Sequence, residues 1–216
     1  MRRSNLPPTN TKSKALPTTG KGKNTALTIL LAAEQLLIDE GYHNFSLRKV
    51  ASAADLTLGN LQYYFPSKDS LIKAMLDNYI ERYLTLFERI RSDAGADPRE
   101  QFTALISGIV RDLNNKSTTV FFPEVWSLSN HDDHATEFMD AMYGRYRDVL
   151  IDVITLINPS LSPDQLRRLA IFISASLEGH TMFIGHKKPW EHETETIASL
   201  GAQSFLWLIE SGDIPD

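Results

Sequence analysis

A run of small and hydrogen-bonding residues between positions 57 and 64 is the stretch of this sequence best suited to contact a polar partner. If the run is helical, apolar side chains at i, i+3 and i+7 spacing share one side of the helix. That apolar side consists of Leu58, Leu61 and Phe65, and the other side of Gly59, Asn60, Tyr63 and parts of Gln62 and Tyr64. A solvated helix surface more often carries Lys and Glu. Amide, phenol and hydroxyl groups, with a glycine that permits close approach, instead suit base edges and phosphates in a major groove of DNA.

Two short helices joined by a tight turn are predicted to position this run. Ser46 is a suitable N-cap for a first helix over residues 46–54, whose apolar residues fall on one side. Asp55 ends that helix, because Asp tolerates the left-handed backbone conformation better than most residues. Thr57 is a suitable N-cap for the second helix. Residues 45–71 therefore predict a helix-turn-helix.

The segments around this pair of helices carry further matches to a known pattern. They are GY at 41–42, SLRKVASAA at 46–54 and LTLGNLQYYFPSKDSLIKAM at 56–75. Over about residues 26–76 the sequence resembles the N-terminal helix-turn-helix domain of the TetR family of transcriptional regulators. It differs from the usual family pattern at Asp55, where glycine is common, and at Gln62, where tyrosine is common. Because Gln62 would face DNA, no operator sequence is predicted.

The resemblance and the helix faces together give a set of expected DNA contacts, with double-stranded DNA as the partner. Residues on the open side of the two helices are expected to reach the groove, and residues at their edges to hold the sugar-phosphate backbone. The first group is Arg48, Thr57, Gly59, Asn60, Gln62 and Tyr63, and the second is Ser46, Tyr64 and Lys68.

The charge distribution favours the same interpretation. Residues 1–92 hold 13 Lys and Arg against 8 Asp and Glu, whereas residues 93–216 hold 9 against 19. A basic module that meets a polyanion, attached to an acidic body that does not, explains this asymmetry. Residues 1–23 contain six basic residues, three prolines and no acidic residue. They predict a disordered basic arm, which either adds phosphate contacts or serves only as a solubilising tail.

Cysteine content and hydropathy indicate in which cellular compartment the protein is expected. The sequence has no cysteine, which excludes disulfides and thiolate chemistry and is compatible with a reducing cytoplasm. Its longest apolar stretch, residues 169–184, is interrupted by Glu178 and His180 and is too short to span a bilayer. The N-terminus lacks the apolar run of a secretory signal. A cytoplasmic protein without a membrane partner is therefore predicted.

Beyond the helix-turn-helix the sequence shows only helical patterns, so the predicted fold class is all-α. The predicted divisions are a DNA-binding domain over 24–71, a connecting helix over 72–92, and a ligand-binding and dimerisation domain over 93–216. The helices of the last domain are predicted at about 98–115, 118–129, 132–157, 163–185 and 193–210.

The resemblance implies that a small-molecule effector binds inside the second domain. Large apolar residues there are more often ordinary core than ligand contacts. Polar groups interleaved with them are nevertheless the kind that orient a ligand within an apolar lining. The candidate lining residues are Phe122, Trp126, Met139, Tyr143, Glu178, His180 and Met182.

The last two long helices carry apolar and small residues suited either to packing within the chain or to pairing with a second copy. In the family that this sequence resembles, these helices form a four-helix bundle across a twofold axis, which favours a homodimer. The expected interface residues are Leu166, Ala170, Ile173, Leu177, Gly201, Phe205 and Leu208.

Two further motifs have weaker support. The segment from His131 to His134 could bind a metal, but it lacks a clear third ligand and is better explained as a helix start. Ser46 and Lys49 match the S-x-x-K motif of β-lactamases, whose companion motifs are absent. No catalytic, metal or cofactor site is predicted. The sequence favours a ligand-responsive regulator, and more specifically a repressor. A helical enzyme or small-molecule carrier with an incidental basic end is the alternative.

Overall fold

The computed structural model describes residues 20–215, and within that range the chain forms helices and no β-strand. The all-α prediction is therefore confirmed. The N-terminal part contains α1 (Gly20–Glu40), η1 (Tyr42–Asn44), α2 (Leu47–Ala53), α3 (Leu58–Tyr64) and α4 (Lys68–Asp93). The C-terminal part contains α5 (Pro98–Asp112), α6 (Lys116–Ser129), α7 (Asp133–Ile157), α8 (Pro163–Gly179), α9 (Thr181–Ile184), η2 (Glu191–Glu193) and α10 (Thr194–Ser211).

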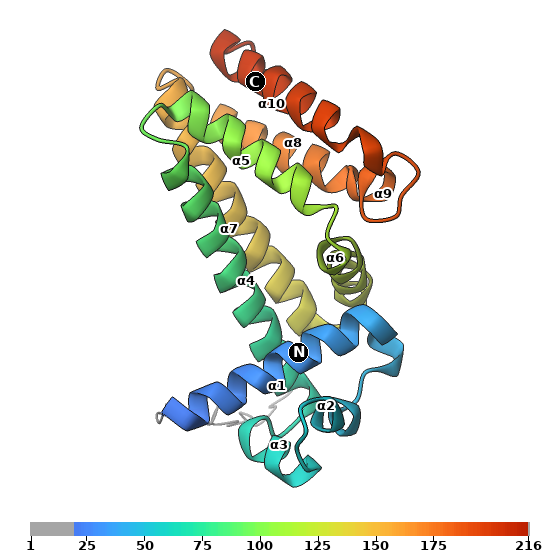
Figure 1. The fold of residues 1–216 in the computed structure, drawn as a ribbon. Coiled ribbons are helices and arrows are strands. Elements are labelled where there is room, and N and C mark those ends of the chain that lie inside the picture. Colours follow the sequence, from blue (N-terminus) through green and yellow to red (C-terminus); the bar gives the residue numbers. More distant parts are fainter. Residues whose placement is uncertain (1–19, 216) are drawn as a thin grey trace, which may run out of the picture.

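The helices form a small lower domain and a larger upper one, joined by α4 (Figure 1). Helices α1 to α3 gather at the lower end, and α4 runs from this cluster upward beside α7. Helices α5, α8 and α10 cover the upper end, and α6 lies between the two levels. The α4 helix begins in a capping box, in which the Ser67 side chain accepts from the Ser70 backbone and the Ser70 side chain accepts in return.

The hydrophobic core is divided, and the division does not follow the predicted domain boundary. One cluster joins α1 to α4 with α6 and the first half of α7, and it includes Phe121, Phe122 and Met139. The other cluster joins α5 with the second half of α7, α8 and α10. Tyr83 and Tyr143 pack against both clusters. The lower part of the C-terminal domain thus shares its core with the helix-turn-helix.

Two predicted boundaries need correction. The predicted arm ended at residue 23, but α1 begins at Gly20, so residues 20–23 are helical. The rest of that arm, residues 1–19, lies outside the described residues. The predicted helix over 163–185 is interrupted: α8 ends at Gly179, and the short α9 begins at Thr181. An apolar periodicity that continues through such a break does not reveal it in the sequence.

Candidate nucleic-acid interface

The turn between α2 and α3 is built by local hydrogen bonds. The Ser46 side chain accepts from the backbone N–H of Lys49 at 3.3 Å and caps α2. Asp55 adopts the left-handed backbone conformation, with φ of 55°, which glycine would adopt with less steric strain. The Thr57 side chain then accepts from the backbone N–H of Asn60 at 3.2 Å and caps α3. Both predicted caps and the predicted turn residue are present, and each helix has a defined start.

Helix α3 separates its two faces as the apolar spacing requires. Leu61 and Phe65 are buried against α1, α2 and the start of α4 in the first core cluster. On the other side, the Tyr63 side chain is 59% exposed, and Asn60 and Gln62 are also exposed. Tyr64 is half-buried, and its ring meets that of Tyr63 edge-on. The side of α3 that faces solvent therefore presents amide and phenol groups rather than charges.

Gly59 on this face has no packing role inside the protein. Apart from the adjacent residues and the backbone of the helix itself, no heavy atom of the described residues would lie within 4 Å of a Cβ atom added there. Glycine inside a helix costs roughly 0.5–1 kcal/mol relative to alanine. The fold alone would therefore be better served by alanine. A glycine at this place is consistent with the close approach of a partner's backbone.

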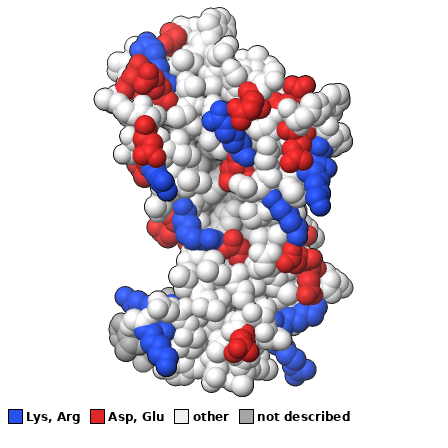
Figure 2. Space-filling model, in the orientation of Figure 1, with Lys and Arg blue, Asp and Glu red and all other residues white. Residues whose placement is uncertain are grey.

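Three basic residues near α3 differ in their surroundings. Arg48 is exposed, and none of the ion pairs among residues 20–215 includes it. Lys49 pairs with Glu40 at 2.5 Å. The Lys68 ammonium lies 3.9 Å from the centre of the Tyr42 ring, and burial lowers its pKa. Figure 2 shows mostly basic side chains on the visible face of the lower end and mixed charges above it. Of these three residues, Arg48 is thus the one most available to a phosphate.

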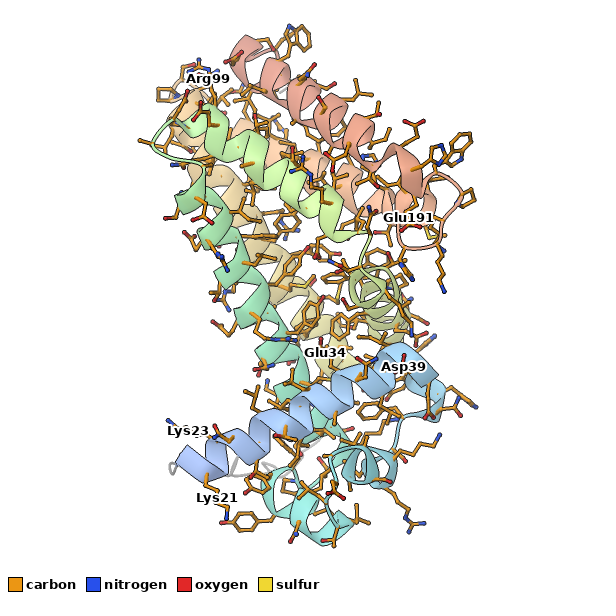
Figure 3. All side chains as sticks on the ribbon, in the orientation of Figure 1. Lys21, Lys23, Glu34, Asp39, Arg99 and Glu191 are labelled. Carbon is orange, nitrogen blue, oxygen red and sulfur yellow. The ribbon has the colours of Figure 1, made fainter. Side chains whose placement is uncertain are left out.

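Three polar contacts hold the helix-turn-helix to the rest of the chain. The Glu124 carboxylate on α6 accepts from the backbone N–H of Tyr42 at 2.9 Å. Lys116, at the start of α6, pairs with Asp39 at 2.5 Å, and Arg82 on α4 pairs with Glu34. Figure 3 shows Glu34 and Asp39 on the side of α1 that faces the upper domain.

Helix α6 carries a proline in its interior. Pro123 has no backbone N–H, so the carbonyl of Thr119 lacks its regular helical donor. A helix is easier to bend at such a position. Pro123 lies directly between Phe122, which belongs to the shared core, and Glu124, which holds the helix-turn-helix.

A small internal cavity lies where the two core clusters meet. It is lined by residues of α4, α6, α7 and α8: Ile80, Tyr83, Leu84, Phe122, Met142, Tyr146 and Glu178. Its free space is about 10 Å³, enough for one water molecule. The Glu178 carboxyl is the only acid in this lining, and burial raises its pKa to about 7.

The structure separates the predicted ligand residues into groups. Phe122 and Glu178 line the cavity. Tyr143 adjoins it, and its hydroxyl accepts from Trp126 Nε1 at 2.9 Å. Met139 is buried in the first core cluster, and His180 is half-buried at the break between α8 and α9.

Met182 does not line the internal cavity, and its side chain is 59% exposed on α9. The sequence interpretation also missed the cavity residues of α4, Ile80, Tyr83 and Leu84. An apolar periodicity identifies the inner side of a helix but does not reveal a cavity beneath it.

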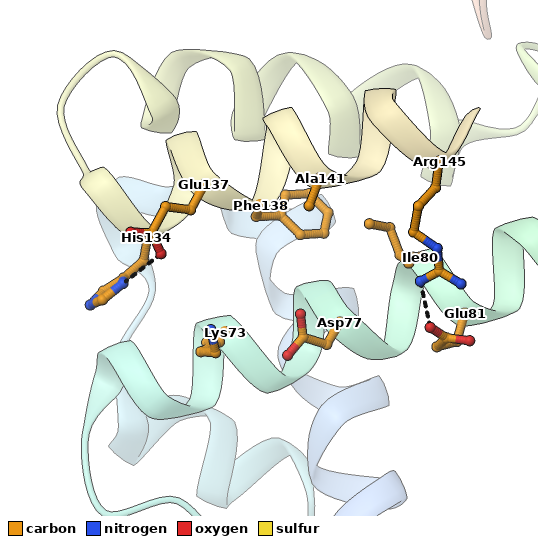
Figure 4. A pocket seen from close by; sticks show the side chains of 9 residues that line it. All are labelled: Lys73, Asp77, Ile80, Glu81, His134, Glu137, Phe138, Ala141 and Arg145. Atoms are coloured by element: carbon orange, nitrogen blue, oxygen red, sulfur yellow. Dashed lines mark hydrogen bonds and ion pairs between the residues drawn. The ribbon is translucent and has the colours of Figure 1, made fainter. Parts of the chain in front are cut away.

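A larger hollow of about 550 Å³ lies on the surface between α4 and α7 (Figure 4). Its lining is mainly charged, and it includes the Arg145–Glu81 pair at 2.6 Å and the His134–Glu137 pair at 3.8 Å. Opposite charges there neutralise one another within the protein. This groove is therefore less suited than the internal cavity to orient an apolar ligand.

The predicted dimer residues need correction. Ala170, Ile173, Leu177 and Phe205 are buried in the chain's own second core cluster, so they are not available to a second copy. Leu166, Gly201 and Leu208 are half-buried. The spacing identified the apolar side of each helix but not which side stays exposed. The large apolar residues exposed on α8 and α10 are instead Ile171, Phe172, Leu200 and Trp207.

The helix-turn-helix with its polar outer face and the larger helical domain define a DNA-binding regulator. Residues 29–75 match the sequence pattern of the family described as "Bacterial regulatory proteins, tetR family". The chain is 29% identical over 157 residues to an uncharacterised HTH-type transcriptional regulator of Xanthobacter autotrophicus, covering 71% of this chain and 76% of that protein. It is 30% identical over 111 residues to the HTH-type transcriptional repressor KstR of Mycolicibacterium smegmatis, covering 49% of this chain and 54% of KstR.

Solved structures have the same fold. A transcriptional regulator from Rhodococcus sp. Rha1 superposes with a TM-score of 0.71 at 16% identity, covering 88% of this chain and 99% of that one. A TetR-family regulator from Rhodococcus sp. superposes with a TM-score of 0.65 at 17% identity, covering 88% and 98%. The protein is a transcriptional regulator of the TetR family.

None of the helices that residues 20–215 form has both the length and the apolar character of a membrane-spanning segment.

Proposed function

We propose that this regulator is a repressor that binds a palindromic operator as a homodimer and leaves it when a small molecule fills the internal cavity. The observation that carries the DNA-binding part is the outer face of α3. Exposed Asn60, Gln62 and Tyr63 surround a glycine that the fold itself does not require. These groups can donate to and accept from base edges, and Arg48 beside them, which forms no ion pair with any described residue, can bind a phosphate.

The homodimer is supported by the apolar residues on the outer sides of α8 and α10. Phe172 is 54% exposed and Trp207 is 68% exposed. Aromatic residues of this size are the usual central contacts of protein interfaces. One recognition helix reads only a few base pairs, whereas two copies joined through the upper domains can read both halves of a palindrome.

Release by an effector is supported by the position of the cavity. It lies beside Phe122. The next two residues are Pro123, which lies inside the helix, and Glu124, which accepts a hydrogen bond from the backbone of Tyr42. A ligand larger than the present space must displace part of the lining. A displacement of α6 would change the contact that orients the helix-turn-helix.

Selection of bound DNA from a random library, followed by gel shifts, tests this function. We expect a palindromic site and an affinity that falls steeply with salt, because phosphate contacts release counterions. Sedimentation should show two chains per duplex. A protein that binds no DNA at low salt, or that binds every sequence equally, would contradict the proposal and favour a carrier or an enzyme. Compounds that release the selected DNA would then identify the effector.

A further inference from the structure

The internal cavity contains a carboxyl group without a balancing cation. Glu178 lines the cavity together with Tyr83 and Tyr146. None of the ion pairs among residues 20–215 includes Glu178. Burial raises its pKa, and the nearby Tyr143 hydroxyl lowers it by a smaller amount. Glu178 is half-buried, and a cation that enters the cavity would stabilise the ionised carboxylate, because opposite charges attract more strongly in a partly dehydrated site than in bulk water.

Tyr146 adds a second group that lacks a partner. Its side chain is buried, and its hydroxyl makes no hydrogen bond with any described residue. Buried polar groups are hydrogen-bonded in most proteins, so each exception requires an explanation. The neighbouring Tyr143 differs, because its oxygen already accepts from Trp126 Nε1 at 2.9 Å. The Tyr146 oxygen is therefore open to a donor that the protein itself does not provide.

We propose that the cavity binds a protonated alkylamine, whose ammonium group donates hydrogen bonds to the Glu178 carboxylate and to the Tyr146 hydroxyl oxygen. The rings of Tyr83 and Phe122 form part of the same lining, and aromatic faces attract cations. An anion would be repelled by Glu178, and a neutral apolar ligand would leave the Tyr146 hydroxyl without a partner and the Glu178 carboxylate without a balancing charge. The inference rests on the proposed effector function and adds the chemical class of the ligand.

The size of the cavity has a further consequence for binding. Its free space of about 10 Å³ holds little more than the ammonium group. The alkyl chain must therefore displace part of the lining. Phe122 is the one lining residue contributed by α6. A bound alkylamine thus acts on the helix that contacts the helix-turn-helix through Glu124.

Three small probes separate charge from hydrogen bonding in the intact chain. Butylamine carries both features, butan-1-ol lacks the charge, and tetramethylammonium carries the charge without N–H donors. Dissociation constants from NMR titration should be at least about tenfold lower for butylamine than for either other probe, because hydrogen bonds between charged partners are the stronger ones. Equal binding of butylamine and butan-1-ol would overturn the proposal.

Two cavity variants and a matched control locate the site. Glu178→Gln keeps the shape of the side chain, and it should weaken butylamine about tenfold or more without affecting butan-1-ol. Tyr146→Phe should reduce the preference for butylamine over tetramethylammonium without abolishing it, because the hydrogen bond to the Glu178 carboxylate remains. Glu137→Gln removes an acid from the surface groove of Figure 4, and it should leave all three affinities unchanged. An effect of Glu137→Gln equal to that of Glu178→Gln would assign binding to the surface and overturn the proposal.

The pH dependence provides a test that needs no variant. Butylamine binds the ionised form of Glu178, so its affinity should rise between about pH 6 and pH 8, while that of butan-1-ol stays constant. The ionisable groups near Glu178 are Tyr83, Tyr143 and Tyr146, whose pKa values are raised above 10, and His180, whose pKa is lowered by burial. The described lining includes no other ionisable residue. An affinity that does not change over this range would contradict the assignment to Glu178.

DNA binding is measured separately, so that the two proposals can fail independently. If butylamine binds through Glu178 but never weakens the operator complex, the ligand class stands and effector release is wrong. If the protein binds and releases an operator with other compounds while butylamine does not bind, the proposed function stands and the ligand class is wrong.

Discussion

Two exposed faces of this regulator, one on α3 and one on α8 and α10, differ in chemistry. The α3 face carries a glycine, two amides and a phenol. The α8 and α10 face carries Ile171, Phe172, Leu200 and Trp207. The first can make directional hydrogen bonds to a hydrated polyanion, and the second gains free energy only by excluding water. The side chains that remain exposed therefore indicate the kind of partner: DNA for the first face and protein for the second.

The largest expected effect distinguishes neighbouring residues on α8. Ile173→Glu places an unpaired charge in the second core cluster and should cost about 4 kcal/mol or more of unfolding free energy. Phe172→Glu alters the exposed side of the same helix, so it should leave the fold intact but yield monomers with sharply reduced operator affinity. Thermal unfolding measures the stability of the two variants, and sedimentation measures whether they form dimers. A folded, dimeric Phe172→Glu variant with full DNA affinity would place the interface elsewhere.

The next effect concerns the buried side of the recognition helix. Leu61 is fully buried beneath the α3 face. Leu61→Ala should therefore cost about 2–4 kcal/mol of stability, because it removes core contacts and leaves a cavity. Denaturant unfolding measures the loss. An unchanged midpoint would mean that α3 is not packed as described.

Asn60 lies on the opposite side of the same helix. Asn60→Ala should reduce the preference for the operator over other DNA by about 1–3 kcal/mol and leave thermal stability nearly unchanged. Competition binding with operator and unrelated DNA measures the preference. If both DNAs lose affinity equally, the amide contacts a phosphate and not a base.

The smallest effect is expected for Gly59→Ala, which should raise the stability of the fold but lower the affinity for the operator. Gly59→Ala should stabilise the fold by about 0.5–1 kcal/mol, because the added methyl group meets no neighbour and the unfolded chain loses freedom. The same methyl group should weaken operator binding if DNA approaches closely there. A variant that is both more stable and equally tight on DNA would remove the argument for close approach at α3.

The local features of the helix-turn-helix could be predicted from the sequence, because they depend on short-range chemistry. The caps at Ser46 and Thr57 and the turn at Asp55 require only neighbouring residues. The faces of α8 could not be chosen in the same way. Ile171, Phe172 and Ile173 are three successive apolar residues, and only the packing of α5 and α7 against α8 decides that Ile173 is buried. The apolar periodicity narrows down which residues of α8 can be buried, but it does not determine which of them are.

The cavity was predicted only in part, for a related reason. Phe122 and Glu178 were recognised by residue type, but Tyr83 and Tyr146 come from helices whose aromatic residues look like ordinary core. Whether a tyrosine hydroxyl finds a partner depends on contacts between segments far apart in the chain. That property of Tyr146 has no signal in the sequence near it.

The succession of Phe122, Pro123 and Glu124 has a thermodynamic consequence. Phe122 lines the cavity, Pro123 makes the helix easier to bend, and Glu124 contacts the helix-turn-helix. The conformation of α6 should therefore affect both the binding of a ligand in the cavity and the binding of DNA. Coupling between two sites is reciprocal: if an occupant of the cavity lowers the affinity for the operator by some factor, the operator lowers the affinity for that occupant by the same factor. A regulator molecule bound to DNA should therefore need a higher effector concentration to respond than a free molecule does. In a cell with few operators, the many free regulator molecules would bind the effector first and so lower its free concentration.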